Sequence, residues 1–188
     1  MKKISNIIVF AFCVFAISSC VKDRLYAPNL TIDPNNPQVP LDSTIKLTIN
    51  EFLASNSTVS VPGNTNFPDW IEIYNAGETD VNLAGYCITD DLTSKDKYII
   101  PSGSSSTIIK SKSYLLILAD DSVALGPLHT NFKLSSAGES IGLYAPSLIG
   151  LDSITYTAQT TDKSYGRLPN GNGSWQQLTT PTPNAANF

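Results

Sequence analysis

The chain has 188 residues, of which 12 are Lys or Arg and 16 are Asp or Glu, so its formal net charge is −4. With 41% hydrophobic residues, a chain of this length can form one domain with a real core. Nucleic acid is not expected as a partner, because phosphate binding needs clustered Lys and Arg. The nearest grouping here is the scattered set Lys95, Lys97, Lys110 and Lys112.

The N-terminus has the profile of a secretory signal. Lys2 and Lys3 give a positive start, and an uninterrupted apolar run extends from Ile7 to Ile17. A helix that crosses the bilayer core needs about 20 apolar residues, and this run is shorter. The pattern therefore predicts that residues 1–19 are a signal peptide that is removed, and not a transmembrane anchor.

The run ends in Ile17-Ser18-Ser19-Cys20, which resembles a bacterial lipobox, the motif whose cysteine sulfur receives diacylglycerol. Ile17 stands where Leu is usual, and Ser19 where Gly or Ala is commoner. Lipoprotein processing usually adds several acyl chains, which hold a protein far more firmly than the single chain that binds only marginally. We therefore predict lipidation of Cys20 and a lipid-anchored protein of a Gram-negative cell envelope.

The residue after the cysteine bears on the destination. Val21 takes the place of the Asp that often retains lipoproteins at the inner membrane, so the outer membrane is favoured, facing either the periplasm or the exterior. The alternative is an ordinary secretory signal with an incidental cysteine, although no clear Ala-x-Ala cleavage site lies nearby. Removal of residues 1–19 takes away two of the twelve basic residues and no acidic one, which leaves a net charge of −6.

The cysteine count excludes an intramolecular disulfide in the mature chain. Cys13 is lost with the signal and Cys20 carries lipid, which leaves Cys87 alone. Alternation with Tyr86 and Ile88 places the Cys87 side chain on the opposite face of its strand. We interpret it as a small, partly buried filler, with an intermolecular disulfide as the alternative.

Residues 20–43 are rich in Pro and Asn and read as an extended tether. From residue 44 onward, short alternating or β-branched runs are separated by turn residues. This pattern predicts an all-β antiparallel sandwich or barrel of about nine short strands. The expected strands are Ile45 to Leu53, Trp70 to Asn75, Asp80 to Thr89, Lys97 to Pro101, Ser106 to Lys110, Tyr114 to Ala119, Asn131 to Leu134, Ser140 to Tyr144 and Leu151 to Tyr156.

Several motifs, in this order, resemble a bacterial lamin tail domain over residues 44–188. They include Asp69-Trp70-Ile71-Glu72-Ile73-Tyr74-Asn75, Val81-Asn82-Leu83-Ala84-Gly85-Tyr86, Gly138-Glu139-Ser140-Ile141-Gly142-Leu143-Tyr144, Ser164-Tyr165-Gly166-Arg167 and Thr180-Pro181-Thr182-Pro183-Asn184-Ala185-Ala186-Asn187. Tyr86 stands where the family usually has Trp, and Asn184 replaces a common Gly. The resemblance implies an immunoglobulin-like β-sandwich and an interaction or tethering module, which in nuclear lamins contacts protein and nucleic-acid partners.

Few residues offer catalytic chemistry. His129 is the sole histidine, which excludes a multi-histidine metal or catalytic centre. It could act as the base for Ser135, Ser136 or Ser140, but no Gly-x-Ser-x-Gly elbow is present. We therefore assign no catalytic residue.

The carboxylates have structural interpretations. Asp90, Asp91, Asp120 and Asp121 follow expected strands, where Asp commonly caps turns. Calcium is their alternative role, since this cation prefers several converging oxygen ligands, but no contiguous Asp-x-Asp-x-Asp-Gly loop supports it. Glu72 lies within a strand and is expected to be exposed, or buried with a partner such as Arg167 or a backbone amide.

These observations favour a non-enzymatic envelope lipoprotein whose sandwich binds another protein or a glycan. A convergence of the domain's many aromatic side chains on one exposed face would mark the contact surface. A hydrolase of unrecognised type and a calcium-stabilised structural module are the alternatives, and no cofactor other than calcium is considered. We assign no binding residues from the sequence.

Overall fold

The computed structural model describes residues 30–33, 36–42 and 44–188. The predicted signal peptide, residues 1–19, and the lipidation site Cys20 lie outside these residues. Within the described ranges no helix has the length and apolar character needed to span a bilayer.

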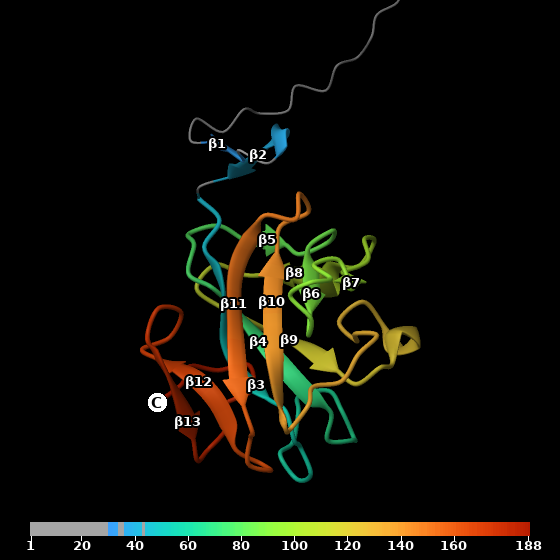
Figure 1. The fold of residues 1–188 in the computed structure, drawn as a ribbon, viewed down its shortest axis with the longest axis vertical. Helices are drawn as coiled ribbons and strands as arrows, with labels where there is room; N and C mark the ends of the chain where they lie inside the picture. Colours follow the sequence, from blue (N-terminus) through green and yellow to red (C-terminus); the bar gives the residue numbers. More distant parts are fainter. Residues whose placement is uncertain (1–29, 34–35, 43) are drawn as a thin grey trace, which may run out of the picture.

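The described domain is all-β, with two antiparallel sheets packed face to face (Figure 1). The five-stranded sheet has the order β13-β12-β3-β4-β9, and the four-stranded sheet has the order β11-β10-β6-β7. Two further two-stranded sheets pair β1 with β2 and β5 with β8. The strands are β1 (Leu30–Asp33), β2 (Asn36–Asp42), β3 (Leu47–Leu53), β4 (Asp69–Asn75), β5 (Val81–Asn82), β6 (Cys87–Thr89), β7 (Tyr98–Ile99), β8 (Ile108–Ile109), β9 (Tyr114–Ala119), β10 (Gly138–Tyr144), β11 (Gly150–Thr157), β12 (Ser164–Leu168) and β13 (Ser174–Leu178), with short 3₁₀ turns η1 (Ser105–Thr107) and η2 (Val123–Leu125). The expected immunoglobulin-like β-sandwich is confirmed.

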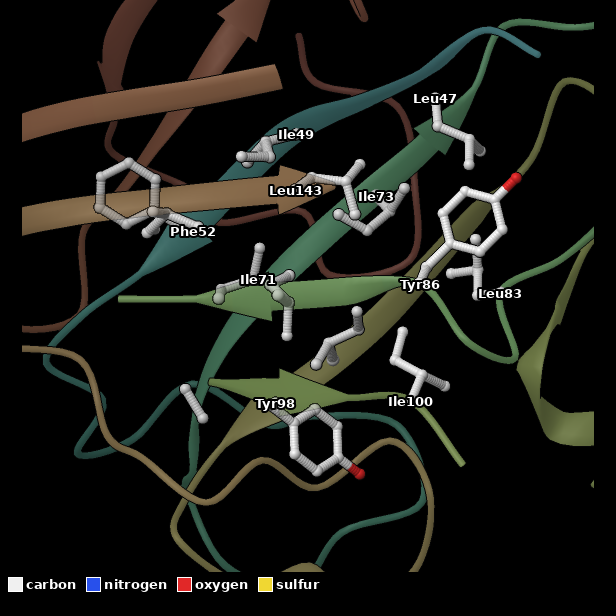
Figure 2. Close-up of a cluster of buried hydrophobic side chains, with 14 of the residues drawn as sticks. Leu47, Ile49, Phe52, Ile71, Ile73, Leu83, Tyr86, Tyr98, Ile100 and Leu143 are labelled. Carbon is white, nitrogen blue, oxygen red and sulfur yellow. The ribbon is translucent and has the colours of Figure 1, made fainter. Parts of the chain in front are cut away.

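The hydrophobic core lies between the two sheets and follows the alternation of the sequence. Ile71 and Ile73 of β4 enter it, whereas Trp70 packs in a second cluster on the other face of the same sheet. Figure 2 shows Leu143 of β10 among side chains of β3 and β4. Burial of each such aliphatic side chain stabilises the fold by about 2 kcal/mol.

A β-bulge at Asn50 interrupts the alternation in β3. Ile49 pairs with Ile73 and Glu51 pairs with Glu72, so Asn50 is an extra residue in the ladder. Ile49 and Phe52 consequently both belong to the core, although simple alternation would separate them. The bulge directs Asn50 and Glu51 to the outer face of the five-stranded sheet, where both are fully buried.

The strand predictions differ from the structure in several places. The expected strand from Ser106 to Lys110 is the 3₁₀ turn η1 followed by the short strand β8. The expected strand from Asp80 to Thr89 is two strands, β5 and β6, separated by a turn that bonds Tyr86 N to Leu83 O. Residues 131–134 form no strand and have one isolated bridge, between Lys133 and Asp120. Strands β12 and β13 were not expected. In the described part of residues 20–43, β1 and β2 form an antiparallel hairpin where a single extended segment was expected.

Cys87 lies on β6 and is 2% exposed, so the interpretation as a buried filler is confirmed. Its sulfur lies 3.9 Å from the carbonyl oxygen of Gly85. Burial raises the pKa of the thiol above its usual value. The side chain is therefore poorly placed for an intermolecular disulfide.

Candidate functional site

Two segments cover the outer face of the five-stranded sheet. The first is the loop between β3 and β4, residues 54–68, whose Val61 packs with Trp70, Leu116 and Leu118. The second is the chain after β13, residues 179–188, here called the C-terminal segment. The C-terminal segment is attached through hydrogen bonds to two buried carboxylates of this face, Glu51 and Glu72.

Glu51 holds the start of the C-terminal segment. The backbone N–H of Thr182 donates to Glu51 Oε1 at 3.0 Å, and the Thr182 hydroxyl donates to Glu51 Oε2 at 2.6 Å. Both residues are buried. Burial raises the pKa of the Glu51 carboxyl, and the hydrogen bonds from Thr182 oppose this shift.

Glu72 holds the next part of the C-terminal segment. Its Oε1 accepts from Asn50 Nδ2 at 2.9 Å, and its Oε2 accepts from the backbone N–H of Asn184 at 2.6 Å. Burial raises the pKa of Glu72 to about 8. Glu51, opposite Glu72 in the ladder, contributes to this raised pKa, because two like charges so close are unfavourable.

The expectation that a buried Glu72 has a backbone amide partner is confirmed, and the suggested partner Arg167 is wrong. Arg167 pairs instead with Asp152 at 3.0 Å and donates to Ile49 O at 3.0 Å. Asn184 has φ of +64°, a left-handed conformation that Gly and Asn adopt most readily. This geometry explains why Asn can stand where the lamin tail motif commonly has Gly.

Asparagine side chains complete the network. Asn187 donates through Nδ2 to Asn50 O at 3.2 Å and to Arg167 O at 3.0 Å. Asn50 Oδ1 in turn accepts from the backbone N–H of Gly171 at 2.8 Å. Asn50, Glu51, Glu72, Thr182 and Asn187 therefore form one connected network of hydrogen bonds, which fixes the C-terminal segment on the sheet.

A pocket of about 270 Å³ lies on this outer face. We call it the outer-face pocket. Leu115, Leu116 and Leu118 of β9 contribute apolar surface, and Asn184 contributes from the C-terminal segment. The remaining lining residues are Val61, Pro62, Asn64, Leu128 and His129. An apolar surface with a few polar groups at its rim is typical of a recognition site.

His129 is hydrogen-bonded to a carboxylate at the rim of this pocket. Its Nδ1 lies 2.8 Å from Asp120 Oδ2, and the two side chains are 14% and 17% exposed. Two of the serines considered as nucleophiles have hydroxyls that bond elsewhere: Ser135 Oγ accepts from the backbone N–H of Ala137 at 3.2 Å, and Ser140 Oγ pairs with Thr155 Oγ1 at 2.8 Å. The histidine thus has an orienting carboxylate, but none of the hydrogen bonds among described residues joins it to a serine.

The four calcium candidates are not brought together. Asp90 pairs with Lys97 at 2.6 Å, and Asp120 pairs with His129. Asp91 accepts from the backbone N–H and hydroxyl of Thr93 at 2.9 and 2.7 Å, which is the turn-capping role that the sequence indicates. The described residues contain no group of three or more His, Cys, Asp or Glu side chains with metal-ligand geometry.

Glu51, Thr182 and the outer-face pocket were missed by reasoning from the sequence. The available signal was the position of Glu51 beside Phe52 in β3, since a carboxylate within an apolar strand needs a partner when buried. The Thr182 side chain and the Asn184 backbone N–H, which bond these carboxylates, lie in the motif from Thr180 to Asn187. Neither signal reveals the bulge that brings the two glutamates together.

The Lamin Tail Domain family model matches residues 41–158, well over half of the chain. Strands β12 and β13 and the C-terminal segment lie after the matched range. No curated protein and no solved structure matches the chain. Together with the antiparallel sandwich of described residues, the match shows that the chain belongs to the lamin tail domain family.

Proposed function

We propose that this chain is a lipid-anchored protein of the Gram-negative cell envelope whose lamin tail domain binds a protein or glycan partner without catalysing a reaction. The anchor part of the proposal rests on the apolar run from Ile7 to Ile17 and on the lipobox-like residues that end at Cys20. Lipid on Cys20 would hold the domain at the outer membrane and leave its surface available to other envelope components.

The binding part of the proposal rests on one observation, the outer-face pocket. Its surface combines the β9 leucines with the uncharged side chains of Asn64 and Asn184. Apolar area gives affinity and a few fixed polar groups give orientation. The buried carboxylates nearby are engaged in holding the C-terminal segment, which supports recognition over hydrolysis as the role of this face.

Affinity capture from detergent-solubilised envelope, with the full chain as bait, tests the binding role. Asn64 is partly buried and lines the pocket, whereas the neighbouring Thr65 is exposed and does not line it. Asn64→Trp should fill the pocket, and Thr65→Trp is the matched control. We expect a saturable partner that is retained by the wild type and by Thr65→Trp but lost with Asn64→Trp. Equal retention by all three proteins would contradict the assignment of this pocket.

A further inference from the structure

The two sheets of the sandwich end differently on one side. The four-stranded sheet ends at β11, whereas the five-stranded sheet continues through β12 to its own end strand β13. In Figure 1, β12 and β13 extend to the side of β11. A groove of about 420 Å³ lies between these end strands, and we call it the edge groove. Its lining includes Thr155, Tyr156, Thr157, Gln159, Tyr165 and Gln177.

An aromatic side chain is held rigidly beside the groove. Tyr165 is half-buried and lies parallel to Trp175, with ring centroids 5.8 Å apart and planes 5° apart. Both rings meet Phe52 of the core edge-on, at 5.9 and 5.8 Å. Because Phe52 is fully buried, Tyr165 offers a fixed ring surface at low entropic cost.

Arg167 fixes the second ring of the pair. Its guanidinium carbon lies 4.6 Å from the Trp175 ring centre, and the same group bonds both carboxylate oxygens of Asp152 at 3.0 Å. The positive charge is therefore neutralised by a neighbour on β11 and is directed at the ring. Arg167 therefore helps to hold the stacked rings of Tyr165 and Trp175 in place, and it does not line the edge groove.

Hydrogen-bonding side chains lie at both sides of the groove. Gln159 Nε2 donates to Thr157 O at 2.8 Å, and Gln177 Nε2 donates to Thr160 Oγ1 at 3.2 Å. Among the described residues no donor is bonded to either amide oxygen or to the Thr157 hydroxyl. These groups are accessible, since Thr157 and Gln177 are exposed and Gln159 is partly so.

Every lining residue of the edge groove is uncharged at neutral pH, in a chain whose net charge is −4. An ionic ligand would find no partner there, and a purely apolar ligand would leave the amides and hydroxyls unpaired. A sugar ring offers both an apolar face of C–H groups and a rim of neutral hydroxyls. We propose that the edge groove binds a neutral glycan, with one sugar ring against Tyr165 and its hydroxyls bonded by Gln159, Gln177 and Thr157.

This inference rests on the binding role proposed above and names the partner class for a second surface. The edge groove and the outer-face pocket share no lining residue. An experiment can therefore disprove binding at one surface without disproving binding at the other. Loss of glycan binding in Asn64→Trp would point to the outer-face pocket, whereas loss in Gln177→Ala would point to the edge groove.

Affinity electrophoresis of the full chain in mild detergent tests the proposal. The gels contain dextran, laminarin or mannan as neutral probes, or polygalacturonate as a charged control. We expect retardation in at least one neutral gel and none in polygalacturonate. Gln177→Ala, at an exposed position, should weaken the binding roughly fivefold, and Tyr165→Ala should abolish it, while Asn64→Trp should bind as the wild type does.

Tyr165 also packs near the core, so each variant is first checked by thermal unfolding. If Tyr165→Ala does not fold, the proposal is tested with Gln177→Ala and Thr157→Ala. Both positions are exposed, so these substitutions should leave the fold intact. The proposal is overturned if no neutral gel retards the wild type. That result would favour the alternative that an end strand, β11 or β13, binds an extended peptide by strand addition. It is equally overturned if Gln177→Ala and Thr157→Ala are retarded as strongly as the wild type.

Discussion

Asn50 is the residue on which the outer face depends. As the extra residue of the bulge, it lets Ile49 and Phe52 share the core and places Glu51 opposite Glu72. Its side chain then donates to Glu72 Oε1 and accepts from the backbone of Gly171. One residue thereby links two strands and the β12–β13 turn.

The contact between Thr182 and Glu51 gives a test at the same scale. Thr182→Val keeps the shape of the side chain but removes the hydroxyl that donates to Glu51 Oε2 at 2.6 Å. A buried acceptor without its donor costs about 1–3 kcal/mol. We expect a loss of this size in the free energy of unfolding, measured by urea denaturation. Thr180→Val, at an exposed position of the same segment, is the control and should change little.

The pKa of Glu72 predicts how stability depends on pH. Its value is raised from 4.5 in the unfolded chain to about 8 in the folded domain. Between these values the folded state keeps a proton that the unfolded state has lost, so raising the pH favours unfolding. Asp69, with a pKa raised to about 6, and Glu51 act in the same direction.

We therefore expect the free energy of unfolding to fall as the pH rises from about 5 to 8, by up to roughly 1.4 kcal/mol per pH unit for Glu72. Urea denaturation at a series of pH values measures this slope. Glu72→Gln removes the titrating group and should flatten the curve. A wild-type stability that stays constant or rises over this range would show that Glu72 is ionised in the folded domain.

At the scale of elements, β12 brings the C-terminal segment against β3. Gly166 of β12 pairs with Glu51 of β3. A Cβ added at Gly166 would lie 2.6 Å from Asn187 Nδ2 and 2.7 Å from Leu178 Cδ1. The glycine is required here because the Asn187 side chain bonds directly over the strand.

Gly166→Ala should therefore displace Asn187 and lower the melting temperature, with a cost of about 1–3 kcal/mol from crowding. Gly150→Ala is the matched control in β11, because the nearest atom to its added Cβ, Tyr144 Cε1, is 3.6 Å away. Thermal unfolding followed by circular dichroism measures both variants. Equal melting temperatures would mean that the C-terminal segment is not held against β12.

The elements show which features a single sequence can predict. Strand β9 matches its expected bounds, Tyr114 to Ala119, because it is a continuous apolar run that ends at Asp120, and β4 differs by one residue because Ile71 and Ile73 alternate with Glu72. Strands β12 and β13 contain Gly166, Gln176 and Gln177, which give no alternation of apolar residues. They form because they pair with each other and with β3, and such long-range pairing leaves no local signal.

The same limit applies to the candidate site. The sequence indicated that Glu72 has a structural role and that Asp91 caps a turn. It could not indicate that Glu51 faces Glu72, because that depends on a one-residue bulge. The expectation for Arg167 failed for a related reason: its partner Asp152 lies on β11 of the opposite sheet.

For the molecule as a whole, we propose that a membrane anchor is joined to a lamin tail domain that binds a partner. The described domain offers an outer-face pocket and an edge groove on separate surfaces. The edge groove depends on β12 and β13, which supply Tyr165 and Gln177, and the outer-face pocket depends on the C-terminal segment, which supplies Asn184. The proposed lipid on Cys20 would set where these surfaces can find a partner.

Metabolic labelling with a clickable fatty acid tests the anchor, and with it the proposed envelope role, most directly. The full chain, Cys20→Ala and the control Cys87→Ala are expressed in a Gram-negative host and compared for label and for processed size. We expect labelled, processed protein for the wild type and Cys87→Ala, and neither label nor processing for Cys20→Ala. Label that persists in Cys20→Ala, or a wild type that never acquires label, would contradict the lipoprotein assignment.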